Sequence, residues 1–213
     1  MIVGLGTGST AHWFIEALGH RCRDEGIGVR GVPTSEASAA QARTLDIPVV
    51  ELPPTGVDLA VDGADQVDPQ LHLVKGAGGA LLRERVVATS AARFVVVVDQ
   101  GKLVTQLGGE LPLEILPFGG ERTLHGAAQL TAGATWRLLA DGQIARSDNG
   151  NLIADARLVG GQDLEQLAGR LDELPGLLGH GLFLGMADLV LAADDDGAVT
   201  ELHPAGVSGS VRR

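Results

Sequence analysis

A carboxylate, an ammonium group and a glycine-rich loop occur close together in residues 75–84. If a helix begins near Gly79, Glu84 lies in its second turn and its side chain leans back toward the loop. The loop N–H groups of residues 76–79 can stabilise an oxyanion, and Lys75 can add positive charge. Together these groups suit proton abstraction beside a carbonyl, with Glu84 as the base. The alternative is an ordinary solvated glutamate with arginine neighbours.

Two aspartates, Asp62 and Asp65, stand in the segment 62–65 that follows directly on residues 57–61, which are apolar apart from Asp58. A parallel strand that ends there would release both carboxylates into a ligand crevice, where they can orient sugar hydroxyls or pass a proton to a ring oxygen. A metal site is the rival, but no histidine or further acid stands at ligand spacing, so we expect no metal. Either aspartate alone would more commonly be a turn former.

Residues 4–10, Gly-Leu-Gly-Thr-Gly-Ser-Thr, stand between an expected strand and an expected helix. Free N–H groups at a helix start attract anions, and hydroxyls of Thr7, Ser9 and Thr10 can add donors. The spacing matches neither a Walker loop nor a dinucleotide fingerprint. A tight turn in which Ser9 caps the helix is the plain alternative.

The remaining polar candidates are weaker. Lys102 follows the expected strand 94–99 and can reach the same crevice, although a surface lysine is the default interpretation. The histidines are scattered, and Cys22 has no nucleophile signature around it, so we do not expect covalent catalysis.

Apolar runs alternate with helical patterns through the first half of the chain. We expect strands at residues 1–5, 27–32, 49–52, 57–62 and 94–99, and helices at 9–17, 34–45 and 79–90. This alternation predicts an α/β fold, a Rossmann-like parallel sheet over residues 1–110. The rhythm then changes to strands at 111–118, 135–139, 152–154, 177–184 and 188–191 and helices at 121–130 and 163–174. We expect a small α+β lobe over 111–185, with 186–213 returning to the first sheet.

Composition narrows the classes of partner. The 213 residues carry a formal net charge of −11, which disfavours nucleic acid and anionic membrane surfaces but permits a small anionic ligand. No apolar run approaches the ~18 residues of a membrane span, and no signal peptide is recognisable. A single cysteine, Cys22, fits a reducing cytoplasm.

In order along the chain, these motifs resemble the type A family of ribose-5-phosphate isomerases. The resemblance runs over residues 4–10, 34–38, 61–65, 75–84, 99–102, 111–117 and 147–151. It implies a Rossmann-like domain with a ferredoxin-like lobe, assembled as a homodimer or homotetramer. It further implies reversible conversion of D-ribose 5-phosphate to D-ribulose 5-phosphate in the pentose phosphate pathway, without metal or other cofactor.

The resemblance also assigns residues. Glu84 would be the base, aided by Asp62, Asp65 and Lys75, with Asp62 or Lys75 assisting ring opening. The residues that would contact or line the substrate site are Thr7, Gly8, Ser9, Thr10, Asp62, Gly63, Ala64, Asp65, Lys75, Gly76, Ala77, Gly78 and Lys102.

Three features depart from the family pattern. The family has a helix with a basic residue before its first strand, whereas Met1 stands within that strand, so either the start is misplaced or those phosphate contacts are missing. Ala77 replaces a usual glycine, and strain follows if its φ is positive. Residues 183–188 lack an expected polar or basic side chain.

Two other functions stay open from sequence. One is a non-catalytic sugar-phosphate sensor, although this acidic chain has no recognisable DNA-binding segment. The other is an isomerase or deaminase acting on a different sugar phosphate.

Overall fold

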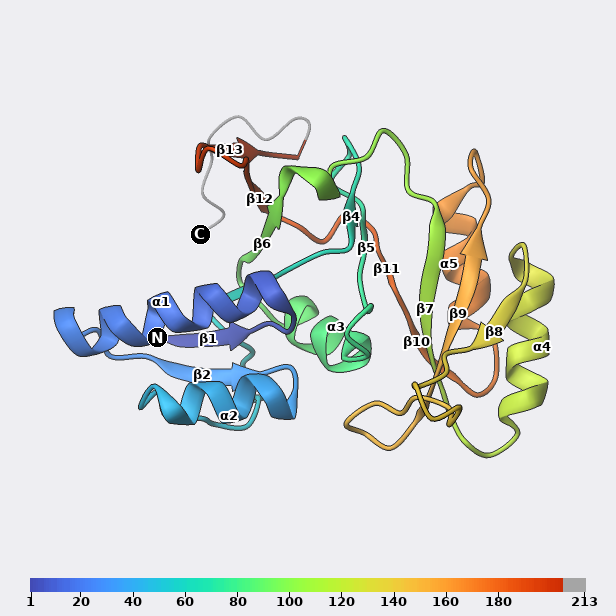
Figure 1. The fold of residues 1–213 in the computed structure, drawn as a ribbon, viewed down its shortest axis with the longest axis horizontal. Helices are drawn as coiled ribbons and strands as arrows, with labels where there is room; N and C mark the ends of the chain where they lie inside the picture. The colour runs from blue at the N-terminus through green and yellow to red at the C-terminus, as the bar shows by residue number, and fades with distance from the viewer. Residues whose placement is uncertain (205–213) are drawn as a thin grey trace.

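The first half of the chain and its last described segment build a six-stranded sheet, as the computed structural model shows for the described residues, 1–204 (Figure 1). Its order is β13-β12-β6-β3-β1-β2, and every pair is parallel except the edge pair of β13 with β12. The strands are β1 (Ile2–Leu5), β2 (Arg30–Pro33), β3 (Leu59–Asp62), β6 (Phe94–Asp99), β12 (Leu189–Ala193) and β13 (Val199–Leu202). The predicted Rossmann-like α/β class is confirmed.

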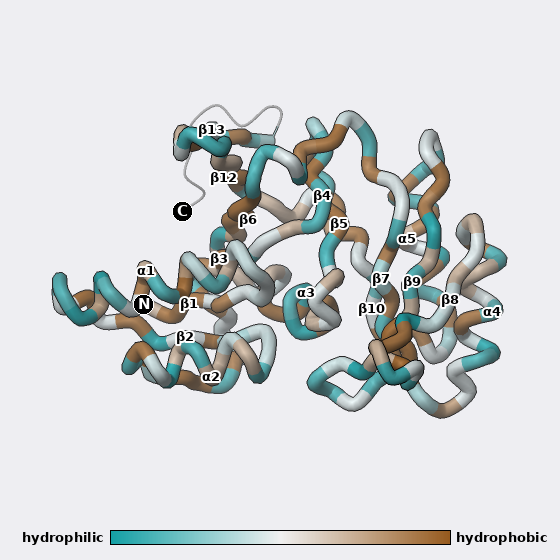
Figure 2. The backbone as a smooth tube through the Cα atoms, viewed as in Figure 1, coloured by the Kyte–Doolittle hydropathy of each residue, from teal (hydrophilic) through white to brown (hydrophobic). Residues whose placement is uncertain are grey.

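Helices cover both faces of this sheet. Successive residues of a strand point to opposite faces, so Ala60 and Val61 of β3 lie on different sides. Helices α1 (Ser9–Glu25) and α2 (Glu36–Thr44) pack together on one face, where Ile15 and Ala42 meet β1. Helix α3 (Leu81–Thr89) packs on the opposite face, where Val87 joins Ala60. Figure 2 shows hydrophobic colour along β6 and β12, two neighbouring strands that each have a strand on both sides.

The second half forms a smaller lobe around an antiparallel sheet of order β10-β7-β9-β8. Its elements are β7 (Gly109–Ile115), α4 (Gly120–Leu130), β8 (Ala134–Trp136), β9 (Leu152–Leu158), α5 (Leu164–Asp172) and β10 (Leu177–His180). This βαββαβ order is ferredoxin-like. In Figure 1, α4 and α5 lie on the side of this sheet away from α3.

A third sheet of very short strands connects the two parts. It contains β4 (Gln66–Val67), β5 (Leu73–Val74) and β11 (Leu182–Phe183), in the order β11-β5-β4. Two-residue strands have no periodicity, so the sequence did not reveal β4 and β5, and it merged β10 with β11. The consequence for the site is that Lys75 emerges directly from β5.

Several predicted boundaries were wrong. Gly8 is the N-cap of α1, Ser9 is its first residue, and the helix continues to Glu25, where Gly26 closes it in a left-handed conformation. The predicted strand 49–52 forms only a single bridge, between Val49 and Gly31.

The end of the chain was predicted to return to the first sheet. Strands β12 and β13 belong to that sheet, and β13 was not predicted. Residues 205–213 of this segment lie outside the described residues. No helix in residues 1–204 has the length and apolarity that crossing a membrane requires.

Candidate active site

The chain reverses direction across the sheet between β1 and β3. From β1 it proceeds outward to β2, and then crosses back to β3 on the other side of β1. The loops that follow β1 and β3 therefore diverge, and this switch point is where open α/β sheets bind ligands. The loop after β1 carries Thr7, and β3 ends at Asp62.

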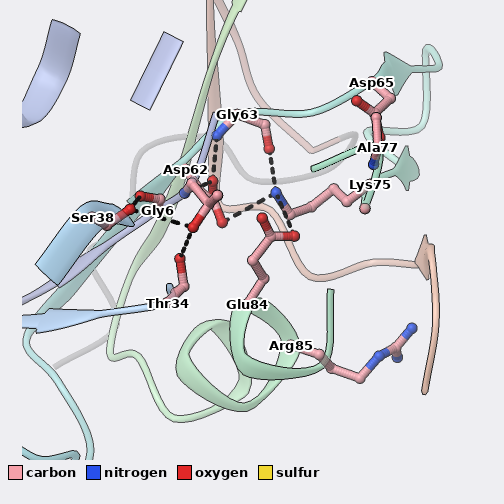
Figure 3. Close-up of polar contacts among 12 residues, drawn as sticks. Gly6, Thr34, Ser38, Asp62, Gly63, Asp65, Lys75, Ala77, Glu84 and Arg85 are labelled. Carbon is pink, nitrogen blue, oxygen red and sulfur yellow. Dashed lines mark hydrogen bonds and ion pairs between the residues drawn. The ribbon is translucent and has the colours of Figure 1, made fainter. Parts of the chain in front are cut away.

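Three charged side chains meet under this switch point (Figure 3). The Lys75 Nζ lies 3.1 Å from Oδ2 of Asp62 and 3.3 Å from Oε2 of Glu84. All three residues are at most 4 % exposed. A buried charge costs free energy unless an opposite charge pairs with it. Because one ammonium faces two carboxyl groups, only one of the two can be fully compensated when both are ionised. We call Asp62, Lys75 and Glu84 the charged cluster.

Asp62 is anchored mainly by backbone groups. Its Oδ1 accepts hydrogen bonds from the N–H groups of Thr7 at 3.0 Å and Gly63 at 2.7 Å. The close approach depends on Gly6, where a Cβ atom would stand 2.2 Å from the same Oδ1 and 2.6 Å from the Asp62 Cα. Asp62 thus ties the loop after β1 to the loop after β3, while its other oxygen faces Lys75.

Lys75 is held by its backbone and by its ammonium group. Its N–H donates to the Gly181 carbonyl at 2.9 Å, and its Nζ donates to the carbonyl of Gly63. The ammonium also lies 5.6 Å from the centre of the buried Phe183 ring, within cation–π range. Phe183 was not recognised as a site residue from sequence, since an isolated aromatic residue gives no signal.

Glu84 lies in the first turn of α3, because the helix begins at Leu81 rather than near Gly79. Its side chain points toward Lys75, whereas that of Arg85 points away (Figure 3). The solvated alternative is wrong, since Glu84 is 4 % exposed. Its Oε2 has no well-aligned hydrogen bond within the described residues, although the Lys75 ammonium is near. The Lys75 ammonium is therefore the only group among the described residues that pairs with this oxygen.

Burial dominates the ionisation of the charged cluster. Burial, reinforced by the negative charge of Asp62, raises the pKa of Glu84 to about 8. Burial also raises the pKa of Asp62, although Lys75 opposes this shift. Burial alone would lower the pKa of Lys75, but its attraction to Asp62 and Glu84 outweighs that effect and raises it. A carboxyl group with a pKa near neutrality can both take and return a proton.

The glycine loop lies beside the charged cluster. Gly76 has a φ of 107°, a conformation that suits glycine. Ala77 is not among the non-glycine residues with positive φ in the described chain, so no backbone strain arises there. The Ala77 N–H donates to Oδ2 of Asp65 at 2.9 Å, which connects the second aspartate to the loop. Asp65 therefore contacts the loop and none of the charged cluster directly.

The loop after β1 divides into an inner and an outer part. The hydroxyl of Thr7 lies 2.7 Å from that of Thr34 and 3.3 Å from that of Ser38, inside the protein. Gly8 and Ser9 are exposed at the start of α1. A Cβ atom on Gly63 would lie 4.0 Å from the Thr10 Cβ, which places Thr10 against the loop after β3. Sequence reasoning from single residues missed Thr34 and Ser38.

Lys102 and Ala64 are the expected site residues with the weakest connection to the charged cluster. Lys102 lies in a short 3₁₀ segment, Gln100–Lys102, that follows β6. Because β6 is the neighbour of β3, this segment stands at the same edge of the sheet as Asp62. Lys102 is half-buried. Among residues 1–204, the Lys102 side chain makes no hydrogen bond or ion pair with the charged cluster, and Ala64 has no polar side chain.

A hollow of about 370 Å³ lies in the small lobe, between α4 and α5 and away from the charged cluster. It contains the exposed side chains of Arg122 and Arg170. We give more weight to the switch point, because it holds buried ionisable groups. Over residues 1–204, no three His, Cys, Asp or Glu side chains are grouped as a metal would require.

The doubly wound sheet and the ferredoxin-like lobe define a two-lobed α/β protein, and the charged cluster at its switch point has the groups that proton transfer requires. Residues 30–197 match the family of ribose 5-phosphate isomerase A (phosphoriboisomerase A). The ribose-5-phosphate isomerase A of Nitrobacter hamburgensis is 45 % identical over 205 residues, covering 92 % of this chain and 88 % of the relative. This chain belongs to the ribose 5-phosphate isomerase A family.

Solved structures agree with this assignment. The ribose 5-phosphate isomerase A of Methanocaldococcus jannaschii is similar with a TM-score of 0.89 and 36 % identity, over 95 % of this chain and 91 % of that one. A D-ribose-5-phosphate isomerase in complex with phospho-erythronic acid has a TM-score of 0.89 and 35 % identity, over 95 % and 90 % of the two chains.

Proposed function

We propose that this protein interconverts D-ribose 5-phosphate and D-ribulose 5-phosphate, a step of the non-oxidative pentose phosphate pathway, with Glu84 as the base. The observation that carries the proposal is the Glu84 carboxyl group, buried beside Lys75 and Asp62 with a pKa of about 8. Aldose–ketose isomerisation needs one group that takes a proton from one carbon and returns it to the next. A carboxyl group with a pKa near the working pH suits both steps.

The reaction begins with opening of the sugar ring. The hydroxyl at C1 loses its proton, the ring oxygen gains one, and the C1–O bond to that oxygen breaks to leave an aldehyde. The charged groups beside Glu84 that can carry these protons are Asp62 and Lys75, which lie 3.1 Å apart. Asp65 helps less directly, because its carboxylate is held by the Ala77 N–H.

Proton transfer follows in the open form. Glu84 takes the proton from C2, the electron pair forms the C1–C2 double bond, and the aldehyde oxygen becomes an enediolate oxygen that gains a proton. The hydroxyl at C2 then loses its proton as its carbonyl forms, and Glu84 returns a proton to C1. Lys75 and the N–H groups of Gly76 and Gly78 stabilise the negative oxygen, whereas the Ala77 N–H is held by Asp65. A positioned base contributes roughly 10²–10⁴-fold, so these donors supply much of the remaining rate.

The phosphate end of the substrate lies at the start of α1 in this proposal. The N–H groups of the N-cap Gly8 and of Ser9 and Thr10 lie at the start of a 17-residue helix, where they present partial positive charge to an anion. Lys102 adds a cation at the same sheet edge. Thr7, Gly63 and Ala64 line the sugar end of the site with their backbone. The Thr7 hydroxyl is already engaged by Thr34, so only the backbone of Thr7 remains for the sugar.

The test is an isomerisation assay on the chain in buffer with a chelator, using D-ribose 5-phosphate and a panel of other pentose and hexose phosphates. We expect conversion of D-ribose 5-phosphate at full rate with no added metal. Faster turnover of another sugar phosphate would favour a different substrate. Thermal stabilisation by D-ribose 5-phosphate without turnover would favour the sensor alternative.

The proposal includes a homodimer or homotetramer that acts in the cytoplasm. Phe118 is 87 % exposed and Leu138 is 61 % exposed on the small lobe, and burial of such side chains favours association. The single Cys22 suits a reducing compartment. Light scattering during size-exclusion chromatography measures the number of subunits.

A further inference from the structure

We propose that Arg137, which belongs to the small lobe, is a positioning residue that fixes the direction of the Gly78 N–H group in the active site. The inference rests on the proposed function, because it concerns the donors that stabilise the enediolate oxygen. Arg137 follows β8 directly, and its own N–H donates to the Ile153 carbonyl of β9 at 3.0 Å.

The guanidinium of Arg137 bridges the lobe and the glycine loop. Its Nη1 donates to the carbonyls of Gly76 at 3.2 Å and Ala77 at 2.7 Å. Its other two nitrogens pair with both carboxylate oxygens of Asp155 on β9, with the Nε contact at 2.8 Å. A bidentate arginine–carboxylate pair is rigid in direction, so the lobe holds the guanidinium in one place.

Arg137 contacts two peptide planes, of which the Gly76–Ala77 plane is also held by the Gly79 N–H, which donates to the Gly76 carbonyl at 3.0 Å. In a trans peptide the carbonyl of one residue and the N–H of the next point in opposite directions. The Gly76 carbonyl points at Arg137, and the Ala77 N–H correspondingly donates to Asp65. The Ala77 carbonyl also points at Arg137, so the Gly78 N–H points away from the lobe.

Of the two N–H groups in the peptides that Arg137 contacts, that of Gly78 remains available, because the Ala77 N–H is held by Asp65. The Gly78 N–H makes no hydrogen bond to another residue within the described chain. A Cβ atom on Gly78 would lie 3.7 Å from the Thr7 side chain, so this residue faces the loop after β1. A charged donor on the carbonyl of a peptide also polarises it, which strengthens the N–H at its other end. Arg137 therefore both orients this donor and increases its strength.

The experiment compares Arg137→Met with the control Arg146→Met, which removes an exposed arginine whose Nη1 donates to the Gly150 carbonyl within the lobe itself. We measure kcat and KM for D-ribose 5-phosphate, inhibition by phospho-erythronic acid, and NMR order parameters of the amides of residues 76–78. Because an oxyanion donor acts in the transition state, we expect kcat to fall about 10–100-fold in Arg137→Met, with KM changed less than about 3-fold.

Each outcome decides the proposal. Loss of loop order together with the kcat decrease and weaker inhibition supports it, and Arg137→Lys should restore part of kcat. Unchanged kcat, an equal effect in Arg146→Met, or loop amides as ordered as in the wild type would overturn it. If the wild-type chain does not turn over D-ribose 5-phosphate but Arg137→Met still disorders the loop, the proposed function fails while the positioning role stands.

Discussion

At the scale of single residues, the proposed chemistry depends on two opposing effects on the pKa of Glu84. Burial beside Asp62 disfavours its charged form, whereas Lys75 favours it. The resulting pKa of about 8 keeps the carboxyl group largely neutral below pH 8 and allows it to ionise above that pH. We expect such a group to be less stable in the fold, when ionised, than a neutral amide of the same shape.

The pH dependence of activity follows from this shift. Because Glu84 must be ionised to act as a base and its pKa is about 8, we expect kcat/KM to rise about tenfold per pH unit below pH 8 and to level off above it. Measurement from about pH 6.5 upward keeps the substrate phosphate largely dianionic, since its second pKa is ~6. An activity already constant above about pH 6 would contradict the assignment.

Stability should depend on pH in the opposite sense to activity, and a neutral side chain at position 84 should remove this dependence. The pKa of Glu84 is raised on folding, so its contribution to stability is fully present below its ordinary value of 4.5 and is lost as pH rises toward 8. Glu84→Gln removes that loss.

We therefore expect the Tm of Glu84→Gln, relative to wild type, to increase between pH 5 and pH 8. The gain should be on the order of 1 kcal/mol or more, with about 2–4 °C for each kcal/mol. Thermal melts at several pH values measure it, with Glu165→Gln, on the exposed side of α5, as the control. A variant equally destabilised at every pH would contradict this prediction.

At the scale of elements, strand ends and a helix start bring the site together. The sequence indicated β6 with its correct ends, because four consecutive valines are typical of a strand buried on both faces. It did not indicate where α3 begins, because Ala80, its N-cap residue, makes no side-chain cap and carries no signal. It also missed Arg137, whose role depends on contacts between residues more than 50 positions apart.

Gly6, in the loop after β1, makes room for a neighbouring side chain, that of Asp62. Gly6→Ala places a methyl group 2.2 Å from Asp62 Oδ1, so Asp62 must move. We expect a loss of about 1–3 kcal/mol in stability, and a fall in kcat larger than any change in KM.

Gly28→Ala is the matched control for this substitution. A Cβ atom at Gly28 meets nothing within 4 Å. Its effect should stay within about 0.5 kcal/mol, as is usual for a surface change. Denaturant unfolding and steady-state kinetics measure both variants, and indistinguishable behaviour of the two would exclude this role for Gly6.

At the scale of the whole molecule, the two lobes are joined at the site from both sides. Arg137 connects the small lobe to the glycine loop. On the other side, Arg83 of α3 donates to Glu36 of α2 at 3.0 Å and to Asn149 of the lobe at 2.8 Å. Asn149 in turn donates to the fully buried Glu114 of β7, which fixes it to the core of the lobe. We expect these connections to limit relative motion of the lobes.

Arg83→Ala tests this second connection. The ion pair with Glu36 is partly exposed, so its removal should cost less than about 1 kcal/mol of stability. Hydrogen exchange should nevertheless become faster in residues 147–151 and at the start of α2. Arg157→Ala, on an exposed position of β9, is the control. Faster exchange confined to α3 would contradict a connection between the lobes.

The central claim is that Glu84 carries the proton between C2 and C1 of the sugar. Its most direct test follows D-ribose 5-phosphate by NMR in deuterated water, with wild-type protein, Glu84→Gln and the control Glu165→Gln. We expect kcat of Glu84→Gln to fall by about 10²–10⁴-fold or more and carbon-bound deuterium to appear only with the other two, while binding of the substrate persists. Isomerisation and deuterium incorporation by Glu84→Gln at the wild-type rate would contradict the claim.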